Sequence, residues 1–174
     1  MENIMFIVEP KLNREIKILL RGIKQKLGHI PPHFEFFAGI NPTRFKMFID
    51  EINYLTTHPH IQSDFFTLLR YTVANDNGFT YCINLNKSFL LAKGYTLDQL
   101  QALEGTKKVL PLDERHHALF DSVMKAIYEP ESFTLEVINA LKILDWTDAD
   151  ILDAVDHGAF LFRFAKVIKA YSKD

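Results

Sequence analysis

Cysteine is nearly absent from this 174-residue chain, which contains only one, Cys82. A single cysteine excludes an intramolecular disulfide framework and favours a reducing compartment. Glycine and proline are also few, at seven each, and no stretch rich in glycine, proline or serine separates one part of the chain from another. We therefore expect one domain spanning residues 1–174, located in the cytoplasm.

The sequence also lacks a large charge of either sign and a long apolar run. Its net charge is −2 at pH 7, so it has none of the basic field on which nucleic-acid binding relies. No apolar run approaches the roughly 18 residues of a membrane span. The first residues, Met1, Glu2 and Asn3, lack the basic start of a signal peptide. We expect neither nucleic acid nor a membrane among the partners.

Strand patterns are scarce, whereas helical spacing recurs along the chain. Hydrophobic residues make up 48% of the sequence and include fifteen phenylalanines, and in several segments they return every three or four positions. Only the short apolar run at residues 4–8 fits strand and helix equally well. The pattern predicts an all-α fold, a compact bundle of about seven or eight helices with short connections.

Several residues are suited to starting or capping the expected helices. We expect helix starts at Pro10, Pro42, Ser63, Thr80, Thr96 and Thr147. Asp150, three residues after Thr147, is placed to complete a capping box. The lysines and arginines along the first helix, residues 11–26, are expected to form a solvated face.

The chain is organised around residues 65–92, where two apolar helical segments are joined by an Asn-Asp-Asn-Gly turn. This arrangement places Cys82 in the first turn of the second helix. A helix N-terminus lowers the pKa of a thiol, whereas the flanking Phe79, Tyr81 and Ile83 indicate an apolar site that raises it. A reactive thiol and a buried small apolar side chain are both open interpretations.

The segment VANDNGFTYCINLNKSFLLAKGYTLDQLQAL resembles the core of the AhpD-like alkylhydroperoxidase and carboxymuconolactone decarboxylase family. The family's segment reads approximately Val-Ala-x-x-Asn-Gly-Cys-x-Tyr-Cys-x-x-x-His. The end of the chain is also similar, with a Thr-capped acidic start followed by an Ile-x-x-Ala-Val helix at residues 147–155. The resemblance covers roughly residues 28–170 and implies an AhpD-like helical bundle.

In that family, as the resemblance implies, two cysteines form a redox pair, and a histidine and a glutamate belong to a proton relay. Aligned with this chain, the second cysteine falls on Cys82 and the first on Phe79. The histidine falls on Asn86 and the glutamate on Thr67. The chain therefore looks like a divergent member that lacks the Cys-x-x-Cys pair. A dithiol peroxidase needs a second sulfur, and neither Asn86 nor Thr67 titrates near neutral pH.

Two kinds of function remain open, and the sequence does not decide whether the protein is an enzyme. The first is an AhpD-like protein that keeps the fold, has lost the dithiol peroxidase centre, and serves as a binding or assembly module. The second is an enzyme, either a single-cysteine peroxidase that uses Cys82 with an external thiol or a decarboxylase-type enzyme of the same family.

The same reasoning gives expectations for the site and its partners. If a pocket remains where the family reacts, we expect it to be lined by Thr67, Phe79, Tyr81, Cys82 and Asn86. Phe79 in the place of a sulfur makes it smaller and more apolar. We expect no cofactor and no metal. The apolar composition and the resemblance favour a homo-oligomer, as a dimer, trimer or hexamer, with a small molecule as ligand.

Two pairs of histidines suggest a metal site, but their context favours another interpretation. His29 and His33, and His58 and His60, lie in proline-containing turns without a cysteine or an intervening glutamate. We expect them to be surface turn residues.

His117 and Asp121 lie four residues apart on one helical face. This spacing suits a shared proton or metal ion, but it also suits an ordinary solvent-facing pair, which we expect here.

Overall fold

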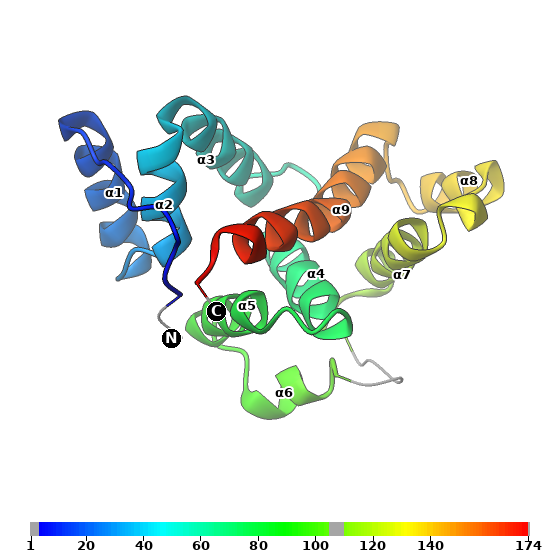
Figure 1. Ribbon diagram of the computed structural model, residues 1–174. Coiled ribbons are helices and arrows are strands. Elements are labelled where there is room, and N and C mark those ends of the chain that lie inside the picture. Colours follow the sequence, from blue (N-terminus) through cyan, green and yellow to red (C-terminus); the bar gives the residue numbers. More distant parts are fainter. Residues whose placement is uncertain (1–3, 105–109, 174) are drawn as a thin grey trace. The chain divides into compact units, whose positions relative to one another are not determined.

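The computed structural model describes residues 4–104 and 110–173. Within these ranges it has nine α-helices, eight of them with at least seven residues, and one 3-10 helix (Figure 1). The described residues form no strand beyond an isolated antiparallel bridge between Phe6 and Ser172. The all-α prediction is confirmed. None of the helices in these ranges combines the length and apolar character needed to cross a membrane.

The chain divides into two compact units. Unit 1 consists of Met1–Thr57 together with Lys166–Asp174, and unit 2 consists of His58–Ala165. This division does not test the expectation of one domain over residues 1–174, which stays a prediction.

Unit 1 is built from α1 (Arg14–Leu27), α2 (Pro32–Ile40) and α3 (Pro42–Thr56). Apolar residues spaced three or four apart along these helices face one another and form a common core. That core contains Ile16, Leu20, Ile23, Phe34, Ala38 and Phe45. The two ends of the chain join unit 1 through backbone hydrogen bonds, in which Ile7 N donates to Tyr171 O at 2.8 Å and Lys173 N donates to Met5 O at 2.8 Å.

The prediction that Pro10 starts the first helix is wrong. The first helix begins at Arg14, and the side chain of Asn13 caps it by accepting a hydrogen bond from Ile16 N at 2.9 Å. Pro10 instead lies against α2, so closely that a Cβ on Gly39 would come within 2.4 Å of the Pro10 Cβ. Pro42 is the first residue of α3, as predicted.

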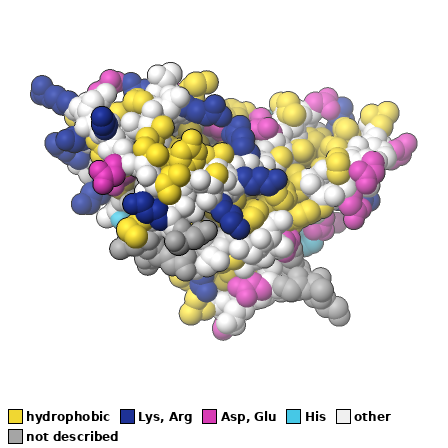
Figure 2. All heavy atoms as spheres, viewed as in Figure 1, with side chains coloured by type: hydrophobic (Ala, Val, Ile, Leu, Met, Phe, Trp, Pro, Cys, Tyr) yellow, Lys and Arg dark blue, Asp and Glu magenta, His cyan; other side chains and the backbone are white. Residues whose placement is uncertain are grey.

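The basic residues of α1 lie on its solvent-exposed side, as predicted. Figure 2 shows lysine and arginine side chains gathered over this helix, which Figure 1 places at the blue end of the chain. The exposed basic residues in this stretch are Lys11, Arg14, Lys17, Arg21, Lys24 and Lys26. The opposite side of α1 supplies Ile16, Leu20 and Ile23 to the core.

Unit 2 contains α4 (Ser63–Asp76), α5 (Thr80–Ala92), α6 (Leu97–Gln101), α7 (Glu114–Tyr128), the 3-10 helix η1 (Pro130–Ser132) and α8 (Leu135–Ile143). It also contains most of α9 (Asp148–Tyr171), whose last residues belong to unit 1. Nine of the fourteen residues of α4 are buried, including Phe65, Leu69 and Tyr71. Helix α4 is therefore the central element of unit 2, and α5 packs closely along it.

Two of the expected caps in unit 2 are confirmed as hydrogen-bonded capping boxes. At the start of α6, Gln99 N donates to Thr96 Oγ1 at 3.2 Å, and Thr96 N donates to Gln99 Oε1 at 2.8 Å. At the start of α9, Asp150 N donates to Thr147 Oγ1 at 3.1 Å, and Thr147 N donates to Asp150 Oδ2 at 2.9 Å.

The expected caps Ser63 and Thr80 are wrong by one position. The capping residues are Gln62 for α4 and Phe79 for α5, and neither makes a side-chain capping bond. Between these two helices the turn is tight, because Phe79 N donates to Ala74 O at 2.9 Å and Gly78 adopts a φ of 65°. The tight turn lets the helix begin at Thr80, so its hydroxyl lies inside the first turn instead of before it.

Candidate functional site

Five side chains in unit 2 form a polar cluster that we call the Arg70 centre: Thr67, Arg70, Cys82, Asn86 and His157. Thr67 and Arg70 lie one turn apart on α4, Cys82 and Asn86 lie one turn apart on α5, and His157 comes from α9. Apart from Arg70, which is half-buried, each is at most 4% exposed. The centre is therefore a polar site inside an otherwise apolar helix interface.

The Arg70 guanidinium holds this cluster together with three hydrogen bonds. Its Nε donates to Asn86 Oδ1 at 2.9 Å, and its Nη2 donates to Thr67 Oγ1 at 3.1 Å. Its Nη1 lies 2.7 Å from His157 Nε2. Asn86 in turn donates from Nδ2 to the backbone oxygen of Cys82 at 2.8 Å. The guanidinium thereby connects α4 to both α5 and α9.

These contacts fix the tautomer of His157. A guanidinium only donates, so His157 Nε2 must accept and the proton of the neutral ring must lie on Nδ1. His157 Nδ1 is buried and has no hydrogen-bond partner in the described residues. Burial and the neighbouring Arg70 charge keep the pKa of His157 well below its ordinary value, so the ring is neutral. The centre thus contains a buried N–H donor for which the described residues provide no acceptor.

Burial dominates the electrostatics of Cys82. It raises the pKa of the Cys82 thiol to about 11, although the Arg70 charge acts in the opposite direction. Burial also lowers the pKa of Arg70 to about 10. At neutral pH the centre therefore contains a neutral thiol and a positively charged guanidinium.

The structure brings together three of the five residues predicted to line the site. Thr67 and Asn86 both accept hydrogen bonds from Arg70, and Cys82 lies in the first turn of α5, as predicted. Phe79 caps α5, and its ring makes an edge contact with Phe162, with centroids 6.5 Å apart. Tyr81 is half-buried beside Cys82 in the chain. The roles proposed for these five residues stay predictions.

Arg70 and His157 were missed by the sequence analysis. Arg70 follows Thr67 by three residues, a spacing that places both on the same face of a helix, and this signal was available. His157 had no comparable local signal, because it lies 87 residues from Arg70 in the chain. Its ring is held between aromatic side chains, stacked on Phe160 at 5.4 Å and edge-on to Phe66 at 5.3 Å.

The expectation that the turn histidines lie at the surface is wrong for two of them. His33 is 1% exposed, and burial lowers its pKa to about 3. The His58 side chain is 2% exposed, and its Nδ1 accepts hydrogen bonds from the backbone N of His60 at 3.2 Å and of Ile61 at 3.0 Å. Both rings are parts of the interior.

His58 and His60 are tied to the start of α9. His58 Nε2 lies 3.6 Å from Asp150 Oδ1 and 3.4 Å from Asp153 Oδ2, and His60 Nδ1 lies 3.0 Å from Asp150 Oδ1. In the described part of the chain, no group of three or more His, Cys, Asp or Glu is arranged to hold a metal ion. These two histidines therefore contact the first turns of α9 and help to hold them in place.

The pair His117 and Asp121 faces solvent, as predicted. His117 Nδ1 lies 3.1 Å from Asp121 Oδ2, with side chains 41% and 64% exposed.

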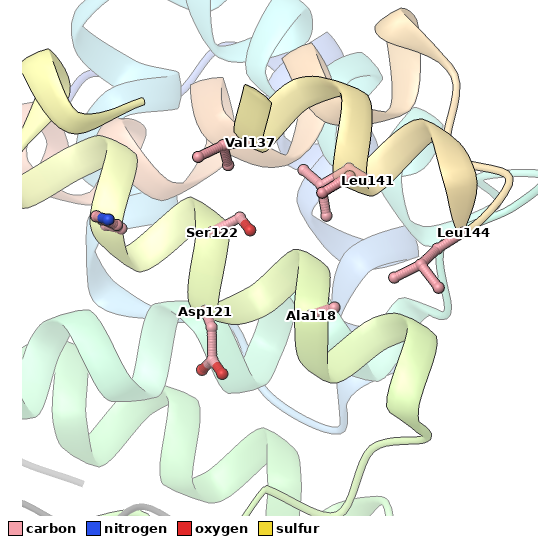
Figure 3. A pocket seen from close by; sticks show the side chains of 8 residues that line it. Ala118, Asp121, Ser122, Val137, Leu141 and Leu144 are labelled. Atoms are coloured by element: carbon pink, nitrogen blue, oxygen red, sulfur yellow. The ribbon is translucent and has the colours of Figure 1, made fainter. Parts of the chain in front are cut away.

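Asp121 also lies at a shallow hollow between α7 and α8, with a volume of about 330 Å³ (Figure 3). Its lining is mostly apolar: Ala118, Asp121, Ser122, Lys125, Val137, Ala140, Leu141 and Leu144. Neither Cys82 nor Arg70 belongs to this lining.

Comparison with known proteins relates the fold to the AhpD type. No protein-family model and no curated protein matches this chain. Among solved structures, it is similar to a peroxidase-related protein from Silicibacter sp. TM1040, with a TM-score of 0.83 and 18% identity over 98% of this chain and 91% of that one. It is also similar to an alkylhydroperoxidase AhpD-core, peroxidase-related protein from Ralstonia eutropha JMP134, with a TM-score of 0.80 and 15% identity over 98% and 92%.

A third similar structure is the debrominase Bmp8, as a variant with a cysteine replaced by alanine, in complex with 2,3,4-tribromopyrrole. Its TM-score is 0.71, with 16% identity over 98% of this chain and 93% of that one. At these identities the likeness concerns the fold alone. The chain has the AhpD-like all-α fold, and it carries one cysteine where a redox pair would need two.

Proposed function

We propose that this AhpD-like protein has lost the dithiol peroxidase centre and uses the Arg70 centre to bind a ligand, without reducing alkyl hydroperoxides. The observation that carries the proposal is that Cys82 is the only cysteine in the chain. In a dithiol peroxidase, a thiolate attacks the peroxide oxygen and releases the alcohol, and the resulting sulfenic acid condenses with a second thiol to give a disulfide and water. This chain has no second thiol for that step.

The surroundings of Cys82 also oppose the first step. The thiolate is the nucleophile, and a thiol with a pKa of about 11 is ionised at pH 7 in only about one molecule in ten thousand. Thr67 and Asn86 accept hydrogen bonds from Arg70 and do not titrate near neutral pH. His157 is a weak base, since burial and Arg70 lower its pKa. A group suited to taking the Cys82 proton is therefore not found among these residues.

Peroxide consumption by the purified protein tests the proposal. With tert-butyl hydroperoxide and an excess of a dithiol reductant, we expect wild type and Cys82→Ala to consume peroxide at the same background rate. Consumption by the wild type that disappears in Cys82→Ala would contradict the loss of peroxidase activity.

A second candidate function is an enzyme that uses Cys82 alone, either a peroxidase resolved by an external thiol or a decarboxylase-type enzyme. The observation in its favour is the Arg70 charge, which lowers the pKa of Cys82 against the effect of burial. The debrominase Bmp8, which has a similar fold, was crystallised with a cysteine replaced and a halogenated pyrrole bound, which supports a cysteine-centred site for small molecules. Trapping with dimedone tests the peroxidase form of this candidate, because only a Cys82 that reduces peroxide would form a sulfenic acid and be labelled rapidly after peroxide addition.

We further propose that the protein assembles as a homo-oligomer and works in the cytoplasm. Large apolar side chains are exposed on α8, where Leu135 is 66% and Ile143 is 82% exposed, and contact between copies would cover them. A free cysteine suits the reducing cytoplasm. Light scattering coupled to gel filtration gives the mass of the assembly. A monomer at micromolar concentration would refute the proposed homo-oligomer.

A further inference from the structure

The Arg70 centre holds a positive charge that no negative group in the described residues balances. Arg70 makes no salt bridge with an aspartate or glutamate there, and its three hydrogen-bond partners are an amide, a hydroxyl and a neutral imidazole. Cys82 does not supply the counter-charge near neutral pH, because its thiol is still protonated when Arg70 is charged. Arg70 is half-buried, so its charge loses part of its hydration, and charges withdrawn from water in proteins are usually paired.

The centre also has more hydrogen-bond donors than acceptors. A guanidinium carries five N–H donors, and Arg70 uses one on each of its three nitrogens. One N–H on Nη1 and one on Nη2 therefore remain without a partner in the described part of the chain. His157 Nδ1 adds a third such donor, in a side chain that is only 1% exposed. The unused N–H groups of Arg70 call for an acceptor, and its unbalanced charge calls for that acceptor to be negative.

We propose that the Arg70 centre binds a small monovalent anion, a halide or a small carboxylate, with the Arg70 guanidinium as its anchor. Such an anion balances the charge and accepts the remaining N–H donors of Arg70, and the planar fork of a guanidinium suits a carboxylate in particular. The Thr67 hydroxyl accepts from Arg70 and keeps its own proton to donate to the anion. This inference rests on the binding role proposed above and names the ligand class for the same site.

Anion-dependent stability of the purified protein is the first test. We expect sodium formate and sodium bromide to raise the thermal unfolding midpoint of the wild type. Arg70→Gln, which keeps hydrogen-bonding capacity and loses the charge, should weaken the apparent affinity by roughly tenfold or more. The matched control is Arg163→Gln, which removes an exposed arginine of the same unit that lies over the Phe160 ring at 5.3 Å. That control should respond to both salts as the wild type does.

The alkylation rate of Cys82 is a second measurement, and it needs no variant. Because Arg70 lowers the pKa of Cys82, an anion that neutralises Arg70 should raise that pKa and slow the reaction with iodoacetamide at pH 9. Formate and bromide should slow it in the wild type and in Arg163→Gln, and not in Arg70→Gln. A wild-type rate that is insensitive to both salts overturns the proposal, even if Arg70→Gln fails to fold.

The two proposals fail in different ways. Peroxide consumption that depends on Cys82 would refute the loss of peroxidase activity, whatever the salts do. Equal salt responses in wild type and Arg70→Gln, without peroxide consumption, would refute only the anion site.

Discussion

At the scale of single residues, Cys82 shows which of two opposing effects controls a thiol. Its place in the first turn of α5 and the nearby Arg70 charge both favour the thiolate. Its burial, at 2% exposure, favours the thiol. Burial prevails, since the pKa is raised to about 11 despite Arg70. A helix N-terminus is therefore insufficient to activate a cysteine that water does not reach.

This balance predicts that the Cys82 thiol reacts slowly with alkylating reagents at neutral pH. The rate of Cys82 alkylation by iodoacetamide in dilute salt should keep rising with pH to about 11 in the wild type. Arg70→Gln removes the charge that lowers the pKa of Cys82, so its profile should shift to still higher pH. Stopped reactions quantified by mass spectrometry give both profiles. A plateau reached below pH 9 in the native wild type would show that the thiol is activated after all.

At the residue scale, the resemblance pointed to Thr67, Cys82 and Asn86 because they stand at positions of the family's motif, and the structure places all three in the Arg70 centre. Their roles stay predictions. Arg70 and His157 were missed for two different physical reasons. An arginine in an amphipathic helix ordinarily faces water, and nothing in the sequence indicates that α9 returns to place His157 against it.

At the scale of helices and turns, helix starts depend on hydrogen bonds that span three residues. The boxes at Thr96 and Thr147 were predictable because both partners are close in sequence. The starts at Ser63 and Thr80 were displaced by one residue, because the preceding turns set the backbone conformation of Gln62 and Phe79. The backbone of the local turn thus decides which of two adjacent residues becomes the cap.

Asp150 should contribute more to the stability of the fold than an ordinary capping residue does. It caps α9 and lies beside the rings of His58 and His60. Although burial opposes ionisation, hydrogen bonds from Thr147 and His60 lower the pKa of Asp150 below its ordinary value. A carboxyl with a lowered pKa stabilises the fold above pH 4, and that stabilisation is lost as the pH falls.

We therefore expect Asp150→Asn to cost about 1–3 kcal/mol at pH 7 and progressively less below pH 4. Urea unfolding at both pH values measures the change. The matched control is Asp156→Asn, on the exposed side of α9. It should leave the free energy of unfolding nearly unchanged. A cost for Asp150→Asn that is the same at pH 3 and pH 7 would rule out the ionised carboxylate as its source.

Two helical glycines should respond oppositely to the same substitution. A Cβ on Gly158 of α9 would lie 2.9 Å from Val123 Cγ1 and 3.3 Å from Ile127 Cγ2 on α7, so Gly158→Ala should destabilise unit 2 by about 1–3 kcal/mol. A Cβ on Gly22 of α1 would meet nothing within 4 Å. Gly22→Ala should therefore stabilise the protein by up to about 1 kcal/mol, through helix propensity alone. Thermal unfolding of both variants measures the two changes in stability. Stabilisation by Gly158→Ala would contradict the close contact with α7.

At the scale of the whole molecule, each unit contains a histidine whose neutral form is favoured by burial. They are His33 in unit 1, with a pKa near 3, and His157 in unit 2, with its pKa well below 6.5. The unfolded chain binds protons at these groups below pH 6.5 and the folded chain does not. Their contribution to stability is therefore complete above pH 6.5 and is lost as the pH falls below it.

We expect the free energy of unfolding to decrease from pH 7 to pH 5, with a slope of up to about 1.4 kcal/mol per pH unit for each histidine. Trp146 is the only tryptophan and is buried in unit 2, so its fluorescence follows that unit while circular dichroism follows all helices. His157→Gln should flatten the decrease seen by fluorescence. An unchanged slope in that variant would assign the pH dependence to other groups.

The helical composition and most helix positions could be predicted from the sequence, because apolar spacing and short turns are local features. The division into two units could not. Unit 1 combines the start of the chain with residues 166–174 through the bridge between Phe6 and Ser172 and its neighbouring backbone bonds. Pairing between distant segments leaves no local pattern to find.

That arrangement also sets an order on biosynthesis. The helices of unit 1 leave the ribosome first, yet the segment that completes the unit is made only after all of unit 2. Unit 2 is a single uninterrupted stretch, so nothing in its connectivity delays its folding during translation. Unit 1 of the nascent protein therefore stays incomplete until the last turns of α9 emerge.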